Sequence, residues 1–105
     1  MTNKQYEVIK DNLHAFLVNF GPVRIESYDG KSFNLYYPAD APEGEYIQHC
    51  YDISYLDGFL YGCVVGVLRV MHMAGKFDGE DWCNRADMVT KRDGNLFTLE
   101  KKEVM

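Results

Sequence analysis

The chain has 105 residues, of which 16 are acidic and 11 are basic, giving a formal net charge of −5 at neutral pH. This length is typical of one domain, and a hydrophobic content of 47% is sufficient for a core and too high for a disordered chain. The acidic balance argues against direct binding to nucleic acid or to an anionic membrane, since both require a basic surface. We therefore expect one compact domain over 1–105, with a frayed end at 101–105.

The cysteines and the apolar runs indicate a cytoplasmic protein. Residues 1–20 contain no uninterrupted apolar stretch, so we expect no signal peptide. Cys50, Cys63 and Cys83 are odd in number and widely spaced, which favours reduced thiols over a disulfide-stapled secreted fold. The longest apolar run, 58–68, would span about 16 Å as a helix, against roughly 30 Å of bilayer core. We interpret it as part of a buried helix and not as a membrane span.

The spacing of apolar residues predicts two helices. Between residues 3 and 20 apolar side chains recur every three or four positions, and Gly21 followed by Pro22 can end that helix. A second helix is predicted from 53 to 74. The intervening segment, 38–52, contains two prolines among acidic side chains and is predicted to be a loop.

Two β-hairpins are predicted, at 23–37 and 88–101, each around an Asp-Gly pair. In the first, a three-residue loop that pairs Ile25 with Phe33 brings the apolar residues onto one face. In the second, two- and three-residue loops both remain open. Residues 76–86 are interpreted as a polar connection. The order α-β-β-α-β-β predicts an α+β fold of two helices and two hairpins, with an antiparallel sheet of about four strands and helices on one face.

The helix predicted over 53–74 carries small residues at every fourth position. A glycine in a helix interior costs about 1 kcal/mol relative to alanine, so a row of glycines indicates the close approach of another backbone. Two interpretations stay open: the first helix or the sheet fills the row within one chain, or the row of a second copy does so in a two-fold dimer. The predicted dimer interface comprises Ser54, Gly58, Gly62, Gly66, Arg69 and Met73.

Eight tyrosines are many for a chain of this length, and several flank the predicted loop. Strand alternation sends Tyr36 outward if Tyr37 faces the core. Tyrosine offers a large, stiff surface with a polar tip, which suits interfaces, and nearby acidic residues would steer a basic partner. The predicted partner-binding surface comprises Tyr36, Asp40, Glu43, Glu45, Tyr46, Tyr51 and Tyr55.

Sequence motifs of catalysis and metal binding are missing. The chain has no phosphate-binding glycine loop, no nucleophile elbow and no H-E-x-x-H motif. His49, Cys50, His72 and Cys83 do not have the C-x₂-C spacing of common zinc sites. A cysteine close to a histidine in sequence does not by itself make a nucleophile pair. We therefore expect a non-catalytic protein with no cofactor and no metal.

These observations favour a homodimeric binding or inhibitory module with a basic protein partner. Small acidic chains without catalytic motifs are typical of phage-encoded proteins that block a host factor, and a nucleic-acid-processing or defence factor with a basic groove is one such target. The alternative is a small nucleotide-like ligand in a tyrosine-lined pocket between subunits. Arg24 or Arg69 would then contact the anionic group of that ligand.

Overall fold

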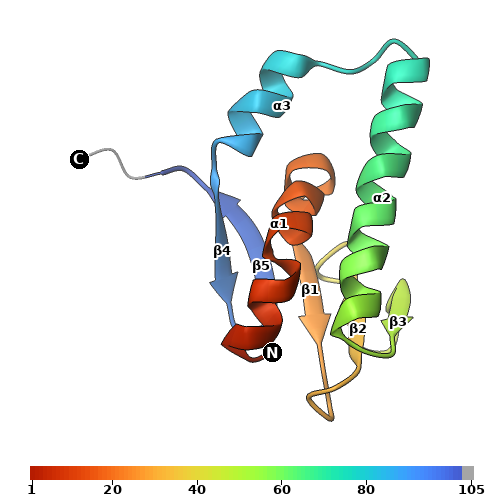
Figure 1. The fold of residues 1–105 in the computed structure, drawn as a ribbon, viewed down its shortest axis with the longest axis vertical. Helices are drawn as coiled ribbons and strands as arrows, with labels where there is room; N and C mark the ends of the chain where they lie inside the picture. The colour runs from red at the N-terminus through yellow and green to blue at the C-terminus, as the bar shows by residue number, and fades with distance from the viewer. Residues whose placement is uncertain (103–105) are drawn as a thin grey trace.

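The computed structural model describes residues 1–102, which form three helices and one five-stranded antiparallel sheet (Figure 1). The helices are α1 (Asn3–Phe20), α2 (Ile53–Met73) and α3 (Gly79–Ala86). The strands are β1 (Val23–Glu26), β2 (Phe33–Tyr36), β3 (Gln48–Cys50), β4 (Val89–Asp93) and β5 (Leu96–Glu100). The α+β class is confirmed, with five strands in place of about four. Residues 103–105, part of the predicted frayed end, lie outside the described residues.

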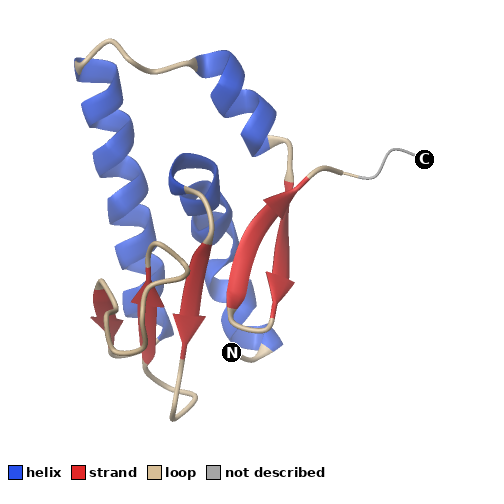
Figure 2. Cartoon of the chain, turned by 180° about the vertical axis from the view of Figure 1, so that it is seen from behind, coloured by secondary structure: helices blue, strands red, loops and turns tan. Residues whose placement is uncertain are grey.

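The sheet order is β3-β2-β1-β5-β4, so both hairpins belong to one sheet and are joined by the β1–β5 pair. α1 and α2 cover one face of this sheet, and the core fills the space between the layers (Figure 1). On the opposite face, the loop between β2 and β3 folds back across the strands (Figure 2). The core combines residues of both helices and of the strands, among them Leu13, Leu17, Ile25, Phe33, Leu35, Leu56, Leu60 and Phe97.

The first hairpin differs from the predicted register. Ile25 pairs with Leu35 and not with Phe33, so the strands shift by two residues and the same side chains still face the core. The shift lengthens the loop, which is held together by Asp29: its carboxylate accepts hydrogen bonds from the backbone N–H groups of Lys31 (2.9 Å) and Ser32 (2.8 Å). Such local bonds compete with the strand ladder and explain the longer loop.

We expect the Asp29 carboxylate to make the stability of the protein depend on pH. Backbone hydrogen bonds from Ser32 and Lys31 lower the pKa of Asp29 to about 2, from an ordinary value of 3.8. A lowered pKa contributes stability above the ordinary value, and this contribution is lost as pH falls toward 2. Asp29→Asn should therefore be less stable than the wild type at pH 6, and the difference should shrink between pH 4 and pH 2. Thermal melts across this range test it, and a difference independent of pH would contradict it.

The second hairpin has a two-residue loop, one of the two lengths left open, but its turn lies one residue later than the predicted Asp93-Gly94 pair. Asp93 pairs with Leu96, which leaves the two-residue loop Gly94-Asn95. Gly94 has φ +60°, and non-glycine residues in the described chain have no positive φ. This combination fits a hairpin turn with glycine at its first central position.

Two elements were missed by the sequence analysis. β3 adds a third strand beside β2, within the segment predicted to be a loop, and pairs His49 with Asn34. α3 occupies most of the predicted polar connection. It is capped by Asp78, whose side chain accepts from the backbone N–H of Asp81 (3.1 Å), and His14 of α1 contacts the carbonyl of Ala86 at its end (3.0 Å).

The second helix is much less buried than expected. Leu56, Leu60 and Val64 are its buried residues, and they face α1 and the sheet. Among the described residues, α2 alone has the length and apolar composition of a membrane-crossing helix, and 17% of its most apolar stretch is buried. The interpretation of this segment as a buried helix is therefore wrong. The upper part of α2 extends beyond α1 and the sheet (Figure 1).

Candidate protein-interaction surfaces

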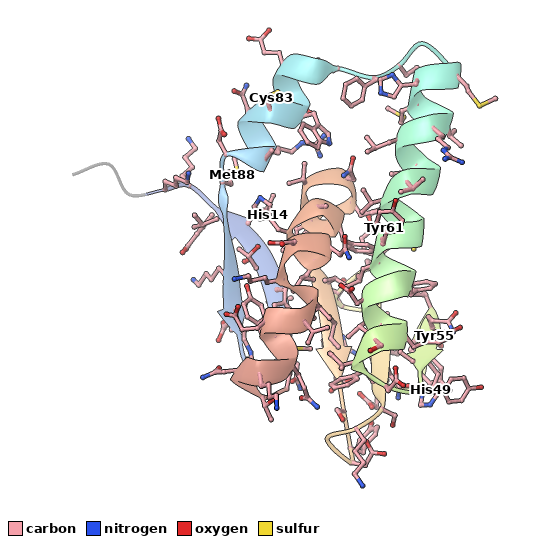
Figure 3. The ribbon with its side chains drawn as sticks, viewed as in Figure 1. His14, His49, Tyr55, Tyr61, Cys83 and Met88 are labelled. Carbon is pink, nitrogen blue, oxygen red and sulfur yellow. The ribbon has the colours of Figure 1, made fainter. Side chains whose placement is uncertain are left out.

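A row of four aromatic side chains, here called the aromatic edge, follows strand β3 at the border of the sheet; its three tyrosines are exposed and His49 is half-buried. It comprises Tyr46, His49, Tyr51 and Tyr55. Successive ring centroids lie 6.2, 5.4 and 5.6 Å apart. Tyr51 is the most exposed, at 73%, with Tyr46 at 42% and Tyr55 at 43%. In Figure 3 His49 and Tyr55 lie together at the lower end of α2.

Hydrogen bonds from neighbouring elements hold this row in place. His49 Nδ1 lies 2.6 Å from Asn34 Oδ1, which orients the imidazole on β3. Gln48 Nε2 donates to the Tyr55 hydroxyl (3.3 Å), which connects the strand to the start of α2. Asp52 caps α2 by accepting from the Tyr55 backbone N–H (2.8 Å). The rings are therefore presented by ordered backbone, and the arrangement suits contact with another protein.

The predicted exposure of Tyr36 is wrong. Its side chain points away from the helices, as strand alternation requires, but it is fully buried. The 37–47 loop folds over it: the Tyr36 hydroxyl donates to Glu43 Oε1 (3.2 Å) and accepts from the Gly44 backbone N–H (3.1 Å). Tyr36 therefore anchors the loop and is removed from the predicted contact residues.

Arg24 fastens the same loop to the sheet. Its guanidinium donates to the carbonyl oxygens of Ala39 and Ala41, the latter at 2.8 Å. It also lies over the ring of Tyr36, 4.1 Å from the centroid. Nε of Arg24 lies 3.4 Å from Glu26 Oε2. All these contacts are internal, so the guanidinium that the alternative hypothesis assigned to a ligand anion is already engaged.

The predicted acidic contacts fall into two groups. Glu43 is drawn into the loop, because it accepts from the hydroxyls of Tyr28 and Tyr36 and approaches Arg24 Nη2 at 3.9 Å. Asp40 and Glu45 are exposed on the same loop, and neither forms an ion pair within residues 1–102. These two carboxylates remain available to a partner.

We expect Glu43 to make the stability of the folded state depend on pH with a sign opposite to that of Asp29. A hydrogen bond with Glu26 raises the pKa of Glu43 above its ordinary value of 4.5, with burial as a further cause. A raised carboxyl pKa means that the folded state loses stability as pH rises from about 4.5 through the folded value. The stability advantage of Glu43→Gln over the wild type should therefore grow from pH 4 to pH 7. Denaturant titrations at these pH values measure it, and a constant or shrinking advantage would contradict it.

The six predicted dimer residues, Ser54, Gly58, Gly62, Gly66, Arg69 and Met73, share one exposed face of α2. Tyr55, predicted as a partner contact, lies on the same face, and all seven residues are here called the open face. A Cβ atom at Gly58, Gly62 or Gly66 would have no neighbour within 4 Å among the residues that the structure describes. α1 packs against the opposite side of α2, where Asn12 Nδ2 donates to Asp57 Oδ1 (2.9 Å). Within residues 1–102 the glycine row is therefore unfilled, which overturns the intrachain alternative.

The residues considered for chemistry lie apart. Cys50 faces the core, where burial raises the pKa of its thiol to about 11, whereas His49 lies on the other sheet face. Cys83 lies on α3, at the opposite end of the molecule from His49 (Figure 3). Residues 1–102 contain no group of three histidine, cysteine or carboxylate side chains placed to hold a metal ion.

One apolar cavity of about 510 Å³ opens on the outer side of the sheet, near the start of the 37–47 loop. Its walls include Phe20, Tyr37, Pro38 and Leu96, and Asp40 is its acidic member. Tyr37 donates its hydroxyl to the Phe20 carbonyl oxygen (2.7 Å). The cavity differs from the ligand pocket expected between subunits, because one tyrosine lines it and α2 does not contribute.

Comparison of the chain with protein-family models, with curated proteins and with solved structures finds no match. The surfaces are therefore interpreted from their own geometry. Sequence reasoning missed Arg24 as the clamp of the loop and His49 as a member of the aromatic edge. The signal for His49 in the sequence was its position among Tyr46, Tyr51 and Tyr55. No sequence signal marked the role of Arg24, because its acceptors are backbone carbonyls fifteen and seventeen residues away.

Proposed function

We propose that the chain is a non-catalytic protein-binding module that acts as a homodimer. The open face of α2 joins two copies, and the aromatic edge binds a basic protein partner. The observation that carries this proposal is the coexistence of two uncovered surfaces on one small domain. One is a helix face whose glycines have no neighbour among the described residues, and the other is a row of rings of which Tyr51 is 73% exposed.

The chemistry of the aromatic edge supports a basic partner. Tyrosine rings pair well with arginine and lysine side chains through cation–π contact, and Asp40, Glu45 and Asp52 place carboxylates on the same segment of chain. Residues of this kind form the energetic centres of protein interfaces, where truncation of one ring costs about 2 kcal/mol or more. Direct contact with nucleic acid or membrane is not part of the proposal, because the net charge is −5.

Affinity capture tests the proposal. The immobilised protein should retain a basic protein from lysate of the host cell, and Tyr51→Ala should reduce the retained amount at least ten-fold. Val8→Ala is a control, because Val8 is also an exposed apolar side chain, at 48%, but lies on α1, outside the aromatic edge. Equal retention by wild type, Tyr51→Ala and Val8→Ala would refute the aromatic edge as the contact surface.

The biological setting we propose is inhibition in a reducing cytoplasm. A phage-encoded antagonist of a host nucleic-acid-processing or defence factor fits an acidic surface, since such factors carry basic grooves for phosphate backbones. The three cysteines, none of which forms a disulfide, suit a reducing compartment. Addition of the purified protein to the captured factor should block its nucleic-acid binding, and unchanged binding would contradict antagonism.

The apolar cavity favours one second candidate, a small ligand. Its lining of Phe20, Tyr37 and Leu96 suits a flat apolar group, and Asp40 suits a cationic substituent more than a nucleotide phosphate. A thermal-shift screen of nucleotides and of aromatic amines distinguishes these ligands, because a ligand of the native state raises the melting temperature.

A further inference from the structure

We propose that the two copies pack α2 against α2 in antiparallel directions, with Gly62 at the two-fold axis and Arg69 of each copy against the Tyr55 ring of the other. This inference rests on the proposed homodimer and adds its direction and its contacts. It also assigns Tyr55 to the dimer, which leaves Tyr46, His49 and Tyr51 for the protein partner.

The spacing of residues on the open face supports a two-fold axis at Gly62. Gly58 and Gly66 lie four positions before and after it, and Tyr55 and Arg69 lie seven positions before and after it. At about 100° per residue, all four fall within about 40° of Gly62 around the helix. An antiparallel two-fold therefore brings Gly58 of one copy beside Gly66 of the other, and Tyr55 beside Arg69.

Charge decides the direction. Arg69 is exposed, forms no ion pair within residues 1–102, and is the basic residue of this face, seven positions after Gly62. A parallel pair would bring the two Arg69 guanidinium groups together, and like charges repel. An antiparallel pair places each guanidinium against a tyrosine ring, which is a favourable cation–π geometry. It also sets the opposite ends of the two helix dipoles side by side.

The same observations favour a second copy over a lipid bilayer as the cover of this face. The charged side chains of Asp57 and Arg69 both lie within α2, and placing charged side chains inside a bilayer is costly. The other side of α2 is tied to α1 by the Asn12–Asp57 hydrogen bond (2.9 Å) and by its buried leucines. A helix–helix contact covers the glycines while leaving that packing intact.

An exchange of the paired residues tests the direction. Tyr55→Arg should raise the dimer dissociation constant at least ten-fold, because two cations then face each other. The double variant Tyr55→Arg with Arg69→Tyr should return the dissociation constant to within about three-fold of the wild type. At each contact between position 55 of one copy and position 69 of the other, one ring again faces one cation. Sedimentation equilibrium measures both constants. Failure of the double variant to recover would overturn the antiparallel register.

A distance measurement separates this inference from the homodimer itself. Nitroxide labels on Val70→Cys, in a Cys63→Ala and Cys83→Ser background, should lie about 24 Å apart along the helix in the antiparallel dimer. A dimer whose labels show no such displacement overturns the direction alone. A wild-type protein that is monomeric at high micromolar concentration overturns the homodimer, and so does one that instead pellets with phosphatidylcholine vesicles.

Discussion

Replacement of Gly62 by leucine is expected to convert the dimer into a monomer, raising its dissociation constant by about 100-fold. Two leucine side chains would enter a contact that the glycines leave open for backbone approach. Overpacking of this kind costs about 1–3 kcal/mol per site, and about 2.8 kcal/mol across the two sites corresponds to the stated factor. Sedimentation velocity across a concentration series measures it.

The same substitution should stabilise the isolated subunit. A Cβ atom at Gly62 would contact nothing within 4 Å in the described part of the chain, and leucine favours a helix interior over glycine by up to about 1 kcal/mol. Loss of the dimer together with a raised unfolding free energy at low concentration therefore excludes misfolding as the cause. Lys4→Leu adds the same side chain to an exposed position of α1 and should leave association unchanged. A Gly62→Leu protein that sediments like the wild type would show that the open face is not the interface.

Arg24→Met is expected to lower the free energy of unfolding by about 2–4 kcal/mol. Hydrogen bonds made by a charged group contribute about 1.5–3 kcal/mol, and the substitution also removes the cation from the Tyr36 ring. The 37–47 loop would lose its attachment to the sheet, so partner capture should fall as well. Urea titration measures the first effect and affinity capture the second.

Two controls sharpen this prediction. Arg24→Lys should recover little of the loss, because an ammonium group cannot reach two carbonyl oxygens with the planar fork of a guanidinium. Lys10→Met removes an exposed cation from the Glu7 ion pair (2.8 Å) and should change stability by less than about 0.5 kcal/mol. If Arg24→Met were no more harmful than Lys10→Met, Arg24 would not be the clamp of the loop.

The sequence predicted a helix correctly where the apolar periodicity extends over many consecutive residues. Apolar spacing in α1 extends over eighteen residues, and the start and end of that helix agree with the structure. α3 has eight residues and no fully buried side chain, so periodicity could not identify it. Its signal was at its ends, with Asp78 as the cap, acids in the first turn and Arg85 in the last turn.

For the candidate surfaces too, the sequence predicted the features that depend on neighbouring residues and missed those that depend on tertiary contacts. The glycine row could be recognised in the sequence, because the unfavourable helix propensity of glycine is a local property. The sequence could not show that the row has no neighbour among the described residues, because that depends on which side of α2 packs against α1. Alternation correctly placed Tyr36 on the sheet face away from the helices. It could not predict the burial of that ring, because Arg24 and Glu43 hold the loop over it through contacts distant in sequence.

Sedimentation equilibrium of the unmodified protein at high micromolar concentration tests the central claim most directly. One chain has a mass of 12.1 kDa. Pairing of the open faces predicts a species of twice that mass that dissociates on dilution. A single species of 12.1 kDa at every concentration would contradict the account.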